Sequence, residues 1–153
     1  MAMQQFTYTM HFRGRVSPSA ENEKILRITS SGTSSTMETI VSPTGVETTL
    51  HPAPGDLAFL ESEVRLNGEN NFEGEGVLTF GDEGEHELQF ATMHAGHMRP
   101  SAVPGTMVGS VSWHIQGGKG RFQSATGLIT STFTLNGSGE LNEYQCGLIF
   151  VAD

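Results

Sequence analysis

The feature that most constrains the fold is a two-residue alternation of apolar and polar side chains between residues 107 and 135. In the stretch 107–115 one parity is apolar and contains Trp113, whereas the other parity is mostly small or polar. Side chains of a β-strand point to opposite faces in turn, so this period is typical of a strand with one buried face. The alternation resumes after a glycine-rich reversal at 116–127, and it predicts that Trp113 and Ser131 face inward from two successive strands.

The same pattern recurs along the chain, most clearly at residues 6–13, where the inward parity is Phe6, Tyr8, Met10 and Phe12. A Pro-Gly turn at 42–45 predicts a hairpin, and residues 95–105 are expected to be an irregular lid. No 3.6-residue pattern is long enough for a helix. The sequence therefore predicts an all-β fold, an eight-stranded closed antiparallel β-barrel forming one domain over residues 1–153. The other strands are expected at residues 24–30, 37–41, 46–51, 57–66, 72–80, 86–94 and 141–151.

The charge and cysteine content exclude several classes of partner. The 153 residues carry 17 acids against 8 Lys and Arg, a formal net charge of −9, so neither nucleic acid nor an anionic membrane is an expected partner. No apolar run approaches the length of a membrane span. The single cysteine, Cys146, cannot form an intrachain disulfide, and no basic, apolar leader precedes the first strand, so we expect a cytoplasmic protein.

The motif GGKGRFQSATG at residues 117–127 carries a resemblance to a known group. Its Gly120, Phe122, Ala125, Thr126 and Gly127 match the Gly-x-Phe and Ala-Thr-Gly turn signature of the allene oxide cyclase barrel superfamily, which includes allene oxide cyclases, dirigent proteins and bacterial barrels of similar length. The chain therefore resembles that superfamily over its last third. The resemblance implies an eight-stranded barrel, often trimeric, whose central cavity holds a hydrophobic small molecule and whose shape sets cyclisation or coupling outcomes.

The inward parity also supplies the candidate site residues. Two interpretations stay open: an ordinary core in which polar tips find hydrogen bonds, or a ligand cavity lined by these groups. On the second, the catalytic candidates are Tyr8, His94 and Tyr144. The ligand-binding candidates are Phe12, His86, Phe90, Trp113, Ser131 and Cys146.

Other groups of polar residues are weaker candidates for a metal, cofactor or catalytic site. His94 and His97 lie three apart, and such positions on a strand face opposite ways, so we expect no metal site. We expect no cofactor either, because the glycine-rich turn joins two strands and does not open a helix. Cys146 has no neighbouring group that would lower its pKa, which favours core packing. The acidic parity of two successive strands is expected to be a solvated face; it consists of Glu61, Glu63, Glu73 and Glu75.

The functional hypothesis is a barrel that binds a small hydrophobic organic molecule, working as a binding protein or as a cofactor-independent enzyme of the cyclase, isomerase or lyase type. Such a catalyst would act by holding a reactive substrate in one folded conformer. The alternative is a structural or interaction barrel with a filled core and no ligand. Both parities of residues 141–151 become apolar near the end of the strand, which predicts a homo-oligomer, a trimer or a dimer.

Overall fold

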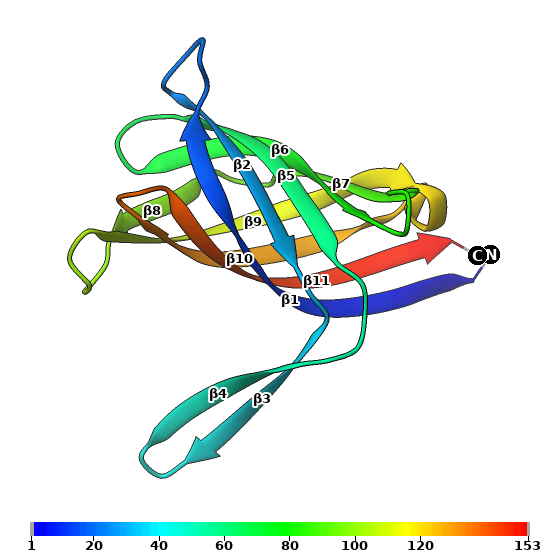
Figure 1. Ribbon diagram of the computed structural model, residues 1–153. Coiled ribbons are helices and arrows are strands. Elements are labelled where there is room, and N and C mark those ends of the chain that lie inside the picture. The colour runs from blue at the N-terminus through cyan, green and yellow to red at the C-terminus, as the bar shows by residue number, and fades with distance from the viewer. Residues whose placement is uncertain (1, 153) are drawn as a thin grey trace.

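Eight antiparallel strands close into a barrel in the computed structural model of the chain, which describes residues 2–152 (Figure 1). Because β10 pairs with both β9 and β11, the ring has no open edge and the predicted fold class is confirmed. In ring order the strands are β10 (Thr126–Asn136), β11 (Glu140–Ala152), β1 (Met3–Pro18), β2 (Ile25–Gly32), β5 (Ala58–Leu66), β6 (Asn71–Phe80), β7 (His86–Thr92) and β9 (Thr106–Lys119).

Packed side chains fill the middle of the barrel. Strands with strict alternation place their apolar parity inward as predicted, and Trp113 is buried. The inward glycines of β6 do not leave an empty space there, because a Cβ at Gly76 would lie 2.7 Å from the ring of Phe90. The largest fully buried side chains are Phe12, Leu60, Leu88, Phe90, Ile129 and Gln145.

A short strand occupies part of the segment that was expected to be an irregular lid. β8 (Gly96–Pro100) pairs with β9 and with the beginning of β6, so this segment extends the sheet at one end of the barrel. β7 accordingly ends at Thr92, and residues 93–95 form the bend between the two strands. The irregular part of the segment is confined to residues 101–105.

The glycine-rich motif forms the turn at the opposite end. It contains a 3-10 helix, η1 (Gly120–Phe122), and Gly117 and Gly120 have φ values of 92° and 61°, which favour glycine. Phe122 is buried and packs against Phe80 at 5.3 Å between ring centroids. The motif therefore closes this end of the barrel. Within residues 2–152, no helix has the length and apolar character needed to cross a membrane.

The predicted hairpin is present and lies outside the barrel. β3 (Ser35–Ser42) and β4 (Gly45–Pro52) pair only with each other and form a separate two-stranded sheet. Figure 1 shows this hairpin projecting away from the barrel wall. We call it the arm, residues 35–52.

Candidate functional site

A buried carboxyl group is the most unusual feature of the barrel interior. Glu143 and Gln145 lie on β11 with 6% and 2% of their surfaces exposed. They share the inward parity of this strand with Leu141, Gly147 and Ile149, whose alternation places them against the core.

A hydrogen-bonded network with side chains from β1, β9, β10 and β11 leads to the Glu143 carboxyl. The Tyr8 hydroxyl donates to Gln145 Oε1 at 3.1 Å, and Gln145 Nε2 donates to Glu143 Oε2 at 2.9 Å. On the other side, Trp113 Nε1 donates to Ser131 Oγ at 3.2 Å, and Ser131 hydrogen-bonds the carboxyl. An indole N–H can only donate, so the Ser131 hydroxyl is left to donate onward to Glu143. The carboxyl is thus the common acceptor of the network.

Burial governs the protonation of this group. It raises the pKa of the Glu143 carboxyl, while the hydrogen bonds from Gln145 and Ser131 act in the opposite direction and are the smaller effects. Within residues 2–152, no basic side chain lies at ion-pair distance from Glu143. The carboxyl is therefore buried without a counter-ion, which favours its neutral, proton-carrying form.

Glu143 lines an apolar pocket at one end of the barrel. The pocket has a volume of about 40 Å³, room for a few water molecules or a small organic group. Its only other polar wall is Ser62, and half-buried Leu26 and Leu135 place its outer part near the barrel rim. The remaining walls are Val16, Ile28, Val64, Phe72, Met98, Val111, Trp113, Phe133 and Leu141.

A second pocket, of about 580 Å³, lies at the opposite end, and Tyr8 is in its wall. Burial, and secondarily the Glu143 carboxyl, raise the pKa of Tyr8 well above the usual tyrosine range, so the phenol stays protonated. Gln145 lies between Tyr8 and Glu143, and the hydrogen-bonded chain therefore connects the two ends through the packed centre. The other walls include Phe6, Met10, Leu57, Phe80, Phe122, Ile149, Asp56, Asp82, Glu85 and His86.

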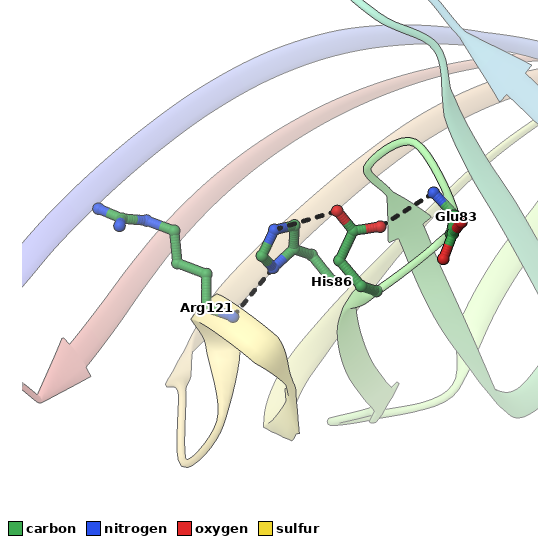
Figure 2. A network of polar contacts seen from close by, with 4 residues as sticks. Glu83, His86 and Arg121 are labelled. Carbon is green, nitrogen blue, oxygen red and sulfur yellow. Dashed lines mark hydrogen bonds and ion pairs between the residues drawn. The ribbon is translucent and has the colours of Figure 1, made fainter.

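The rim of the second pocket is held by the polar network in Figure 2. The Arg121 backbone N–H donates to His86 Nδ1 at 3.1 Å, and His86 Nε2 lies 3.9 Å from Glu85 Oε1. The Glu83 backbone N–H donates to Glu85 Oε2 at 3.0 Å. Backbone hydrogen bonds of this turn lower the pKa of Glu85, and its carboxylate is charged at the rim. His86 is thus a rim residue that fixes the turn, with its ring stacked on Phe80.

The structure brings five of the predicted site residues together inside the barrel. Phe90 packs edge-to-face on Trp113 at 4.9 Å between ring centroids, and both lie in the buried core. Their roles in binding or catalysis stay predictions. The five are Tyr8, Phe12, Phe90, Trp113 and Ser131.

The inward orientation predicted for Tyr144 and Cys146 is wrong. Both are exposed on the outside of the barrel, where the Tyr144 ring stacks on His11 at 4.6 Å. Both parities of residues 141–151 become apolar near the end of the strand, and a one-residue error in parity moves every side chain to the other face. The inward placement of His94 is also wrong, because it lies in the exposed bend after β7 has ended.

The sequence analysis missed Glu143 and Gln145 for the same reason. One signal for the correct parity is Gly147, which pairs with Tyr8 and shares the parity of Glu143. A side chain at residue 147 would overlap the Tyr8 ring, so an inward tyrosine on β1 needs a glycine opposite it. No group of three or more potential metal ligands is present within residues 2–152.

Comparison of the chain with family models, with curated proteins and with solved structures gives no match. The resemblance to the allene oxide cyclase superfamily consequently stays a prediction, and the arguments that follow rest on the geometry of the barrel itself.

Proposed function

We propose that the barrel binds a small, mostly apolar organic molecule at the end that contains Glu143, with this carboxyl as its hydrogen-bond partner. The ligand would place an oxygen acceptor, such as a carbonyl, against the protonated acid. Its apolar body would lie among the aliphatic and aromatic walls of the pocket.

The observation that carries this proposal is a carboxyl buried in an apolar pocket, with no counter-ion among residues 2–152. Burying such a group costs free energy, and well-packed apolar residues commonly stabilise a core at least as well. A barrel that served only as a scaffold would gain nothing from an acid at this position. Functional sites, in contrast, are where stability is given up for chemistry, which favours a site over the filled-core alternative.

The same carboxyl supports a second candidate, cofactor-independent isomerisation or cyclisation. A neutral carboxylic acid can give its proton to a bound substrate and, as a carboxylate, take a proton back from another atom. The substrate then changes its bonding and keeps its composition. The raised pKa of Glu143 favours this role because the acid keeps its proton at higher pH than an exposed glutamate does.

Binding is tested with two probes that have similar shapes, cyclohexanone and methylcyclohexane, of which only the first has a carbonyl oxygen. The pocket of about 40 Å³ would take the carbonyl end, and the ring would extend toward the barrel rim. We expect saturation-transfer NMR to detect cyclohexanone on the wild-type chain and to give a clearly weaker signal on Glu143→Leu. The signal of methylcyclohexane should be similar on both. The matched control is Glu73→Gln, which removes an exposed carboxylate from the outer face of β6.

Absence of binding for both probes would contradict the proposal and favour a structural barrel. An equal cyclohexanone signal on wild type and Glu143→Leu would exclude Glu143 as the partner. Glu143→Gln, which keeps a hydrogen-bond donor but has no acidic proton, separates the two candidates. It should retain binding of the ketone, and it should abolish any isomerisation.

A further inference from the structure

The arm presents two chemically different faces. In an antiparallel pair, directly opposed residues lie on the same face, so the register of β3 and β4 assigns each residue. One face carries Glu38, Glu47 and His51, with Glu38 and His51 at 3.4 Å. The other face has no charged residue, and we call it the apolar face of the arm. It consists of Met37, Thr39, Val41, Val46, Thr48 and Leu50.

The apolar face of the arm is uncovered. Val41 and Val46 are 76% and 70% exposed, and Met37 is 41% exposed. An isolated two-stranded hairpin is marginally stable at best in water, because it has no second layer to bury its apolar side chains. The arm therefore needs a partner surface that the rest of its own barrel does not provide.

The outside of the barrel is also divided into two chemically different parts. The outward residues of β2, β5 and β6 include Arg27, Glu61, Glu63, Glu73 and Glu75, as expected for a solvated face. The outward residues at the middle of β10 and β11, and of β1 before His11, include no acid or base, and we call this surface the uncharged wall. Its members include Thr7, Thr9, Leu128, Tyr144, Cys146 and Leu148.

The uncharged wall and the apolar face of the arm meet where the arm leaves the barrel, beside β1. A groove of about 400 Å³ is lined by Leu50 and Pro52 of the arm and by the outward side chains of His11 and Arg13 on β1. The groove thus connects the two surfaces, and Figure 1 shows the arm projecting from the barrel. Arg13 is the cationic residue that lines the groove between them.

We propose that these two surfaces dock a second copy of the chain, with the arm of each copy lying on the uncharged wall of the other. The net charge of −9 sets the condition for self-association, because two copies repel unless their contact surfaces lack acids. The apolar face of the arm and the uncharged wall meet this condition. Reciprocal contacts of one surface with itself are the usual basis of a symmetric dimer.

The test is the molar mass of the full chain by light scattering and sedimentation across a dilution series. We expect a concentration-dependent equilibrium between one chain and two. Val41→Glu introduces a charge into the apolar face and should raise the dissociation constant about a hundredfold or more. Ile40→Glu is the matched control, since Ile40 is the adjacent exposed residue on the charged face and its change should have little effect.

The wall is tested in the same way with Leu148→Glu, and Phe59→Glu on the outside of β5 is its control. Cys146, the single cysteine, lies on the uncharged wall and supplies an independent measurement. Its alkylation by iodoacetamide should slow as wild-type concentration rises, and Val41→Glu should abolish that dependence. Emission of the buried Trp113 verifies that each variant has folded.

A mass of one chain at every soluble concentration would overturn the proposal. Equal effects of Val41→Glu and Ile40→Glu would overturn the role of the arm. Equal effects of Leu148→Glu and Phe59→Glu would overturn the role of the wall.

Discussion

Tyr8 and Gly147 face each other across β1 and β11, and the tyrosine ring occupies the space in which a side chain at residue 147 would lie. This placement leads the Tyr8 hydroxyl to Gln145, two residues earlier on the same face of β11. The absence of a side chain at one position thus determines the start of the hydrogen-bonded chain that ends at Glu143.

Gly147→Ala should therefore destabilise the barrel, since the added methyl group overlaps the Tyr8 ring and displaces the hydroxyl from Gln145. We expect a loss of about 1–3 kcal/mol in the free energy of unfolding, measured by urea denaturation. In a double-mutant cycle with Tyr8→Ala, the alanine at residue 147 should cost much less. Equal costs in both backgrounds would show that the two residues do not compete for space.

The raised pKa of Glu143 predicts an unusual dependence of stability on pH. The folded state holds the proton at pH values where the unfolded state has lost it, so stability falls as pH rises from the ordinary glutamate pKa to the raised one. The slope contributed by this single group cannot exceed about 1.4 kcal/mol per pH unit. Glu143→Gln should remove this contribution. At pH values above the raised pKa of Glu143, this variant should be more stable than wild type.

Urea denaturation at a series of pH values checks this prediction, with Glu73→Gln as the control for loss of an exposed carboxylate. The difference between wild type and Glu143→Gln should grow with pH and then level off. A difference that is constant over the series would mean that Glu143 titrates alike in the folded and unfolded states.

Ser131→Ala should lower the free energy of unfolding, because it removes the hydrogen-bond acceptor of the Trp113 indole. The indole N–H, buried with the rest of the side chain, would lose its acceptor at 3.2 Å, and Glu143 would lose a donor. An unpaired buried donor costs about 1–3 kcal/mol, and we expect a loss of this size in urea denaturation. Ser110→Ala, at an exposed position on β9, is the control and should change stability little.

The sequence predicts the parts of the barrel whose strands have one polar and one apolar parity. For β1 and β9 the inward residues follow from the alternation alone, and Phe12 and Trp113 are buried as expected. In β11 Ile149 and Leu148 are equally good candidates for the core, so the local pattern does not determine which parity faces inward. The buried carboxyl at residue 143 was missed for this reason.

Other differences between the sequence predictions and the structure arise from contacts between residues far apart in the sequence, which a local pattern does not contain. The hairpin at residues 35–52 follows from its turn residues, but its separation from the barrel is determined by the pairing of β2 with β5. Likewise, His94 continues the alternation of β7, yet pairing of β8 with β9 ends that strand at Thr92. Turn residues and periodicity predict which segments form strands and hairpins. Pairing with strands distant in the sequence determines where each of these elements lies in the fold.

Tyr8 supplies the last prediction, because the hydrogen-bonded chain requires its phenol to stay protonated while the barrel is folded. Burial, the Glu143 carboxyl and Cys146 all raise its pKa above the usual tyrosine value of about 10. The phenolate absorbance of wild type minus that of Tyr8→Phe should therefore begin to rise only above this range, or when alkali unfolds the chain. Emission of Trp113, followed in the same samples, distinguishes these two events. A Tyr8 signal that titrates near pH 10 in the folded barrel would mean that the hydroxyl is in contact with solvent, and the link from the second pocket to Glu143 would then be lost.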